Sequence, residues 1–408
     1  MSKFFQLDQE ENLSAKLKVV GVGGGGCNAI HSMITKGLIG VEYVAINTDA
    51  QVLQNNLAKN KIQIGKNITK GLGAGADPTV GRNAAEEDRE ILKKTLEGTD
   101  MVFVTAGMGG GTGTGASPIV ASIAKSLGAL VIGIVTKPFK WEGKRRMTNA
   151  DEGIAALRQY VDSLIVIPNE RILSLIDGPL SAISAFDKPN EILYEATRGI
   201  ADIITIPGLI NVDFADVRTV MIEGGEALMG CGIASGENRA VEAAQKAISS
   251  PLLEGINIKG AKHILLNVTG SDSLSLEEVS VGNNIIMEAA GEDANIIFGF
   301  VRKEEMNEYV SYTVIATGFD KGSKNKNVNQ QRENISKIVN TSIGYNNNLL
   351  YNPTEEDLDS PTIIRIKTKQ DQNKLREDNS DQLDAFNSIN VNDDYSEDSS
   401  SFLRKMMD

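Results

Sequence analysis

The stretch Gly107-Met108-Gly109-Gly110-Gly111-Thr112-Gly113-Thr114-Gly115 decides how this chain is organised. It follows the apolar run 101–104, which predicts a buried strand, and precedes residues 116–127, whose spacing predicts a helix. A glycine-rich strand-to-helix turn leaves its amides open to an anion, and the helix N-terminus adds unsatisfied donors and a partial positive charge. The two threonines add hydroxyl donors. The pattern therefore predicts a cradle for a polyphosphate, and the alternative, a flexible linker, is disfavoured because buried elements flank the stretch.

A second glycine turn lies near the start of the chain. The apolar strand 17–22 runs into Gly23-Gly24-Gly25-Gly26-Cys27-Asn28, and a helical stretch follows to Ile34. Gly21, Gly23 and Gly26 match the G-x-G-x-x-G pattern that is typical of dinucleotide-binding turns. The next strand, 41–46, ends at Asn47, a poor match to the acid that such domains offer to ribose hydroxyls. By itself this turn suggests NAD.

A third loop of small residues, 71–78, contains Gly75 and Ala76 and precedes a predicted helix over 79–96. Three such loops exceed what a pyrophosphate needs. Parallel strands would bring them to one edge of a sheet, because ligands of such sheets bind beyond the carboxyl ends of the strands. No G-x-x-x-x-G-K-[ST] P-loop occurs at these turns. We therefore expect a nucleoside triphosphate site of another kind.

Side chains suited to the rest of a nucleotide follow further along. The predicted strand 129–135 leads into 136–146, where Glu142 could accept from ribose hydroxyls and Arg146 could neutralise phosphate. A solvated charged loop is the alternative. In the predicted helix 184–203, Phe186 could stack on a purine, and Asn190 carries a donor and an acceptor suited to a guanine edge. A lone aromatic on a helix is otherwise a core residue.

Asp213 and Asp216 stand three residues apart at a predicted helix start. Capping of the helix N-terminus explains one of them. A pair of carboxylates that orients water for attack on a phosphoryl group would explain both.

Length, composition and net charge limit the classes of function that this chain can have. With 408 residues, 41% of them hydrophobic, the chain can bury sizeable cores and form two domains plus a tail. A net charge of -13 without a basic stripe argues against a nucleic-acid partner. Two distant cysteines and two histidines predict neither a disulfide framework nor a zinc site. The longest apolar runs, such as 129–135, are too short to span a membrane, so we expect a cytoplasmic protein without direct membrane insertion.

Together and in order, these segments resemble the FtsZ family of bacterial cell-division GTPases, within the tubulin/FtsZ superfamily. The resemblance covers roughly residues 17–319 and rests on the segments 23–28, 47–49, 71–78, 109–115, 136–146 and 211–217. It implies an α/β fold with a Rossmann-like parallel-sheet GTPase domain, a long central helix, a second smaller α/β domain and a disordered C-terminal tail. The implied boundaries are a flexible N-terminus (1–16), the GTP-binding domain (17–180), the central helix (181–204), the C-terminal α/β domain with the catalytic loop (205–319), a disordered linker (320–400) and a terminal partner-binding peptide (401–408).

The resemblance also implies that GTP or GDP binds with Mg²⁺, which the charge of a triphosphate requires. The implied nucleotide-binding residues are Gly24, Gly25, Gly26, Cys27, Asn28, Asn47, Gly75, Ala76, Gly109, Gly110, Gly111, Thr112, Gly113, Thr136, Pro138, Glu142, Arg146, Phe186 and Asn190. The implied catalytic residues are Asn211, Asp213 and Asp216, which in a head-to-tail filament enter the pocket of the adjacent subunit. Hydrolysis then requires polymerisation, and a heterologous contact that does not close into a ring grows into a filament. Such filaments would form the cytokinetic ring at mid-cell.

Two further regions complete the expectations. In the second domain, the sequence pattern predicts strands at 226–234, 262–268, 295–301 and 309–317 and helices at 237–248 and 274–290. Residues 321–400 are rich in polar residues without a sustained period, which predicts a flexible linker. The chain end, with Phe402, Leu403 and Arg404, is similar to the family's terminal peptide, which docks on membrane tethers such as FtsA. Other division-ring regulators are further implied partners.

Two residues depart from the usual pattern of the family. Cys27 stands where relatives often have Gly, Asn or Ser, which suggests that nucleotide binding is sensitive to thiol modification. Trp141 stands where an aromatic such as Phe is usual, and it is the only tryptophan, so it offers a single fluorescence probe.

Two other classes of function remain open at this point. A dinucleotide-dependent oxidoreductase would use the first glycine turn but leave the stretch 109–115 without a role. A non-enzymatic filament protein would keep the nucleotide as a structural ligand, and the two carboxylates Asp213 and Asp216 argue against it.

Overall fold

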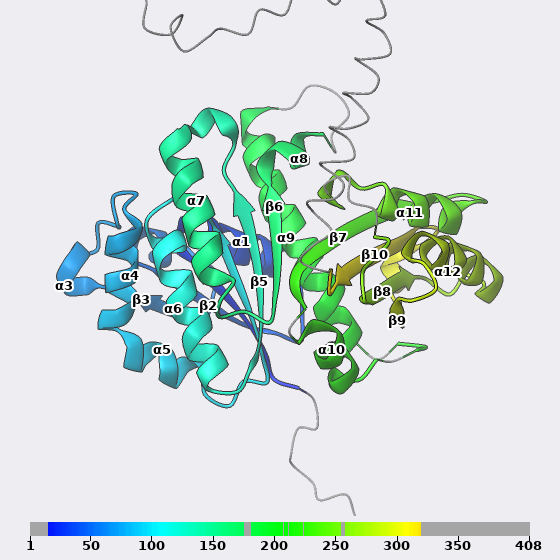
Figure 1. Cartoon of the computed structure of the whole chain (residues 1–408), viewed down its shortest axis with the longest axis horizontal. Coiled ribbons are helices and arrows are strands. Elements are labelled where there is room, and N and C mark those ends of the chain that lie inside the picture. Colours follow the sequence, from blue (N-terminus) through cyan, green and yellow to red (C-terminus); the bar gives the residue numbers. More distant parts are fainter. Residues whose placement is uncertain are drawn as a thin grey trace, which may run out of the picture. The chain divides into compact units, whose positions relative to one another are not determined.

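The computed structural model describes residues 15–174, 181–206, 208–210, 212–222, 224–253 and 258–319. These residues all belong to one compact unit of the chain (Figure 1). The predictions for Asn211, the N-terminus 1–14, the linker 320–400 and the terminal peptide 401–408 lie outside the described residues.

A parallel sheet forms the first half of this unit. Its strand order is β3-β2-β1-β4-β5-β6, and every neighbouring pair in it is parallel. Such strands are buried on both faces, and the consecutive residues Val19 and Val20, which contribute to different core clusters, are both fully buried. The strands are β1 (Leu17–Val22), β2 (Glu42–Asn47), β3 (Asn60–Gln63), β4 (Met101–Gly107), β5 (Leu130–Lys137) and β6 (Ser163–Pro168).

Helices cover both faces of this sheet. On one face, Ile30 of α1 (Gly23–Thr35) and Leu193 of α9 (Ala182–Thr205) join the first core cluster. On the other face, α4 (Pro78–Glu87), α5 (Arg89–Leu96), α6 (Thr112–Ser126) and α7 (Lys144–Leu157) supply the second. Shorter helices are α2 (Ala50–Gln54), α3 (Lys66–Thr69), α8 (Asn169–Leu173) and the 3₁₀ turn η1 (Lys140–Glu142).

Three details differ from the expectations. The predicted helix 79–96 is two helices, α4 and α5, which meet at Asp88 (φ -104°, ψ 23°), whose carboxylate accepts the Gly65 N–H at 2.7 Å. The glycine runs are less loop-like than expected, since α1 already begins at Gly23 and α6 at Thr112. The polar strand β3 (Asn-Lys-Ile-Gln) carries too little apolar pattern to be recognised from sequence.

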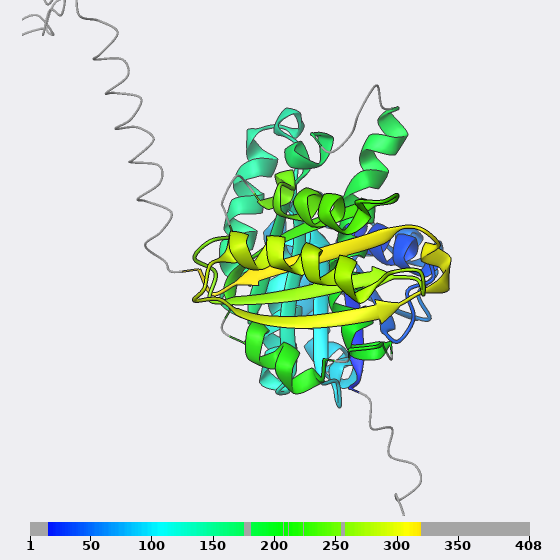
Figure 2. The same cartoon turned by 90° about the vertical axis from the view of Figure 1, so that its right-hand side faces the viewer.

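A second group of strands follows the long helix α9 and the short helix α10 (Phe214–Met221). Strand β7 (Gly225–Ala234) pairs parallel to β6 and antiparallel to β10, and the order continues β7-β10-β8-β9. Figure 2 shows that β8, β9 and β10 run across, rather than along, the strands of the first half. The further elements are η2 (Pro251–Leu253), β8 (His263–Gly270), α12 (Leu276–Ala290), β9 (Asn295–Arg302), η3 (Glu304–Met306), β10 (Val310–Thr317) and α11 (Arg239–Ile248).

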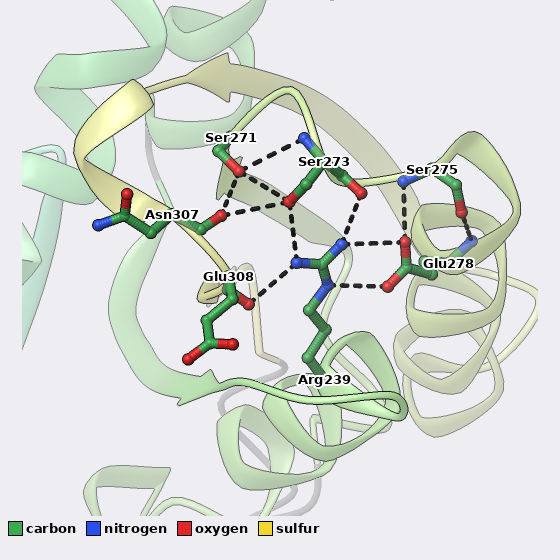
Figure 3. Close-up of polar contacts among 7 residues, drawn as sticks. All are labelled: Arg239, Ser271, Ser273, Ser275, Glu278, Asn307 and Glu308. Carbon is green, nitrogen blue, oxygen red and sulfur yellow. Dashed lines mark hydrogen bonds and ion pairs between the residues drawn. The ribbon is translucent and has the colours of Figure 1, made fainter.

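One buried arginine joins four segments of this second half. The Arg239 guanidinium at the start of α11 bonds both carboxylate oxygens of Glu278, the Ser273 hydroxyl and carbonyl, and the Glu308 carbonyl, at 2.7–3.2 Å (Figure 3). Glu278 also closes a capping box with Ser275 at the start of α12. The arginine therefore ties α11, α12 and the two turns that precede α12 and β10.

None of the helices in the described part of the chain combines the length and the apolar character that crossing a bilayer requires.

Candidate functional site

A cavity of about 550 Å³ lies at the carboxyl ends of the parallel strands. Its lining comes from the segments that follow β1, β2, β3, β4, β5 and β6 and from the first half of α9. The three small-residue loops thus meet at one edge of the sheet, as the topology argument predicts. The predicted nucleotide-binding residues that line the cavity are Gly24, Gly25, Asn28, Asn47, Ala76, Gly110, Gly111, Thr112, Gly113, Thr136, Pro138, Glu142, Arg146, Phe186 and Asn190.

Two helices begin at the floor of this cavity. Neither α1 nor α6 has a side-chain cap, so the first amides of each helix keep hydrogen-bonding capacity for a bound anion. The two turns touch backbone to backbone: a Cβ on Gly23 (φ +73°) would lie 2.6 Å from the Gly113 nitrogen. Glycine is needed there for the close approach and for the left-handed backbone. The pair of turns forms one continuous set of donors for phosphate oxygens.

The two threonines of the second turn have different surroundings. Thr112 lines the cavity, and its hydroxyl lies 2.7 Å from that of Thr48. The Thr114 hydroxyl instead accepts the Gly109 N–H at 2.9 Å in a buried bond. Of these two threonines, only Thr112 therefore lines the cavity, and Gly109, with its amide already bonded, does not line it.

Charged and polar side chains occupy another part of the wall. One Glu142 carboxylate oxygen accepts the Phe139 N–H at 2.9 Å, and the other pairs with Arg146. Asp49 caps α2 through bonds from the Gln51 and Val52 amides at 2.9 and 3.3 Å. The charged side chains of the lining are two carboxylates, Asp49 and Glu142, and one guanidinium, Arg146. These charges do not neutralise a triphosphate, so a counter-cation suits this site.

The structure adds nine residues to the lining that the sequence reasoning had not assigned singly, and Asn169 is the one with an unpaired buried atom. Asn169 lines the cavity, is buried, and its Oδ1 atom has no hydrogen-bond partner. A buried amide oxygen without a partner is costly, and a ligand donor would satisfy it. The signal in the sequence is its position directly after a strand of the parallel sheet, like the other loops. The other lining residues that had not been assigned singly are Asp49, Val52, Gly73, Ala74, Gly107, Met108, Pro189 and Leu193.

Besides Gly109, three other predicted nucleotide-binding residues do not line the cavity, namely Gly26, Cys27 and Gly75. A Cβ on Gly26 would lie 2.4 Å from the Thr105 carbonyl oxygen, so this glycine serves the packing of α1 against β4. Cys27 is fully buried behind the turn, with its sulfur 3.9 Å from Asn47 Nδ2. Burial raises the pKa of the Cys27 thiol to about 12. A buried, protonated thiol does not support the expected sensitivity to thiol reagents.

The two predicted catalytic carboxylates are far from the cavity of their own chain. Phe186 and Asn190 line the cavity near the start of α9, whereas Asp213 and Asp216 follow its C-terminal end. A helix of 24 residues is about 36 Å long. In Figure 1, α8, which follows β6, lies at the top and α10, which carries the carboxylates, at the bottom. Asp213 caps α10 by accepting the Asp216 N–H at 2.8 Å, which leaves Asp216 without a capping role.

Comparison with known proteins gives a consistent result for both halves. The model of the Tubulin/FtsZ family GTPase domain matches residues 16–177, and that of the FtsZ family C-terminal domain matches residues 225–320. A solved structure described as an empty FtsZ dimer from M. jannaschii is 44% identical, with a TM-score of 0.72, and the alignment covers 75% of this chain and 88% of that one.

Two more distant structures share the fold. CetZ1 from Haloferax volcanii, a GDP-bound monomer, is 24% identical with a TM-score of 0.66, over 77% of this chain and 98% of that one. CetZ2 from the same organism, a GTPγS-bound protofilament, is 20% identical with a TM-score of 0.65, and the alignment covers 79% of this chain and 99% of that one. The matches to both family models and the identity to the M. jannaschii protein show that this chain belongs to the FtsZ family of tubulin-like GTPases.

Proposed function

We propose that GTP binds in the cavity, that the chain polymerises head to tail, and that Asp213 and Asp216 complete the cavity of the next subunit. The separation of the two sets of residues carries this proposal. The carboxylates stand at the opposite end of a helix about 36 Å long from the cavity, so they cannot reach a nucleotide in their own chain. They can act only on a neighbour. A dimer and a protofilament among the related structures are consistent with such contacts.

Within the cavity, the roles follow from position. The amides of Gly24, Gly25 and Asn28 and of the 110–113 turn bind the phosphates, with the Thr112 hydroxyl beside them. Asn47 and Glu142 serve the sugar, Arg146 contacts phosphate, and Phe186 and Asn190 bind the guanine base.

Mg²⁺ fits the charge of this site. Among the described residues, no group of three or more His, Cys, Asp and Glu side chains is placed to hold a metal ion. The ion would therefore take most of its ligands from phosphate oxygens and water, and Asp49 and Thr112 are among the lining residues whose side-chain oxygens could contribute. When bound, the Mg²⁺ ion would neutralise negative charge on the phosphates.

The carboxylates have a defined task in hydrolysis. Asp213 and Asp216 of one subunit orient a water molecule for in-line attack on the γ-phosphorus in the neighbouring cavity, and the bond to the β-phosphate oxygen breaks. Asn211 would assist them as a polar neighbour. Because the water is positioned only at the contact, turnover depends on assembly.

The test is GTP turnover per subunit over a range of protein concentrations, with light scattering recorded in parallel. Activity per subunit should be near zero below a threshold and rise together with scattering. Turnover per subunit that stays flat with concentration would refute the shared site. Binding of GTP but not of NAD would exclude the oxidoreductase alternative, and measured turnover would exclude a purely structural nucleotide.

Substitution of the carboxylates sharpens this test. Asp216→Asn and Asp216→Ala should leave GTP binding nearly intact and abolish turnover. Asp213→Asn keeps a good N-cap while removing the charge, so it separates catalysis from helix stability. Glu277→Gln is the matched control, because it removes an exposed carboxylate from the first turn of another helix, α12. Lost binding with unchanged turnover per bound nucleotide would contradict the catalytic role.

In the cell, we infer that the filament forms the cytokinetic ring at the division site. The terminal peptide with Phe402, Leu403 and Arg404 would bind a membrane tether such as FtsA, and the linker would carry it away from the filament. Removal of residues 402–408 should spare assembly in solution and abolish recruitment to tether-coated vesicles. A truncated chain that no longer polymerises would contradict this division of roles.

A further inference from the structure

Three aromatic rings meet at the edge of the cavity. Phe139 and Trp141 are stacked, with ring centroids 5.3 Å apart and an interplanar angle of 13°. Phe186 meets both of these rings edge-on, with centroid distances of 6.0 Å and angles of 90° and 86°. Edge-to-face and offset-stacked arrangements at these distances are attractive. The cluster joins the segment after β5 to the start of α9.

The three rings differ in their surroundings. Phe139 is buried, whereas Trp141 is 66% exposed and Phe186 is 54% exposed. Of the three, only Phe186 lines the cavity. The ring that faces the cavity is thus half in solvent, and Phe139 and Trp141 are its aromatic neighbours.

Hydrogen bonds within the turn and to α8 hold the turn that carries Trp141. Its Phe139 N–H donates to the Glu142 carboxylate at 2.9 Å, and its Lys140 N–H donates to the Glu170 carboxylate at 2.8 Å. Glu142 is held in turn by Arg146. Phe186, by contrast, lies within the first two turns of α9, where residues 184, 186 and 187 are all exposed. A fixed turn therefore contacts the exposed beginning of a helix.

We propose that Trp141 is a positioning residue for the base: together with Phe139 it holds the Phe186 ring, and so fixes the wall of the cavity against which a purine stacks. Trp141 itself does not line the cavity, so it acts through Phe186. The inference rests on the proposed function, in which a guanine nucleotide occupies this cavity.

The first measurement is calorimetric titration of nucleotide-free protein with GDP. Trp141→Ala should raise the dissociation constant about threefold to tenfold, the range that pairs of aromatic rings contribute. Trp141→Phe, which keeps a ring, should stay within about twofold of the wild type. Lys140→Ala is the matched control on the same turn and should bind GDP like the wild type. Unchanged binding by Trp141→Ala would overturn the proposal.

A double-mutant cycle then separates positioning from a general structural effect. Phe186→Ala should weaken GDP binding, and adding Trp141→Ala to it should cause little further loss, because the tryptophan acts through the ring already removed. Additive losses would show that Trp141 acts independently, which would overturn the proposal. If Phe186→Ala bound GDP like the wild type, the base site itself would be wrongly placed and the proposed function would fail. Weakened binding by Phe186→Ala but not by Trp141→Ala would reject the inference alone.

Discussion

Arg239→Met should destabilise the second half of the structure without touching the nucleotide cavity. The Arg239 residue is 8% exposed, and its guanidinium donates to Glu278, Ser273 and Glu308. Methionine fills similar space but leaves the carboxylate and two carbonyls without this donor. Removing one partner of a buried ion pair costs about 3–5 kcal/mol. Because the Glu278 side chain is 26% exposed, water replaces part of the loss, and we expect about 2–4 kcal/mol.

The assay is urea unfolding followed by circular dichroism. Arg302→Met is the matched control, since its side chain is 52% exposed and its partners Asp272 and Glu304 are 66% and 84% exposed. Such surface pairs contribute about 0–1 kcal/mol. If the two variants lost equal stability, the central role of the Arg239 network would be refuted.

The same variant has a pH signature. The hydrogen bond from Arg239 is the largest cause that lowers the pKa of Glu278, from 4.5 to about 2. Since the folded-state pKa lies below the unfolded value, this stabilisation is fully present above about pH 4.5 and is lost as the pH falls towards 2. The difference in unfolding free energy between wild type and Arg239→Met should therefore shrink across that window. A constant difference would contradict the ion pair as its cause.

Three further predictions concern the first half of the chain. Cys27, with its pKa raised to about 12 by burial, should resist a thiol reagent in the native protein and react after unfolding; rapid native labelling would contradict its placement. Gly115→Ala would place a Cβ 2.0 Å from the Pro78 carbonyl oxygen and should lower the unfolding free energy by about 1–3 kcal/mol in urea titrations, whereas Gly24→Ala, with nothing within 4 Å, should not. Asn169→Ala should weaken GDP binding about fivefold in calorimetry with little change in the urea midpoint, and unchanged binding would remove Asn169 from the site.

Much of the candidate site was predictable because its signals are local. A glycine run directly after a buried strand indicates a close backbone turn, and Gly23, whose Cβ would meet the Gly113 nitrogen, shows the steric reason. The alternation of parallel strands and helices then brings the turns together at one sheet edge. This reasoning placed most of the predicted residues around one cavity.

Other features could not be predicted, because they depend on contacts between residues far apart in the chain. Nothing near Cys27 in sequence indicates that its thiol is buried under Asn47. The free oxygen of Asn169 results from how α8 packs after β6, and the five bonds of Arg239 reach residues 34 to 69 positions away.

Local pattern by itself determined the family, most of the strands and helices and the glycine turns, but neither the polar strand β3 nor the break between α4 and α5. Periodicity and the steric freedom of glycine act over a few neighbouring residues, so the sequence carries them directly. The tertiary structure alone decided that Thr112 rather than Thr114 offers its hydroxyl, that Trp141 supports Phe186, and that Asp213 lies at the far end of α9 from the cavity. These relations arise from packing, in which the final place of each side chain depends on all the elements around it.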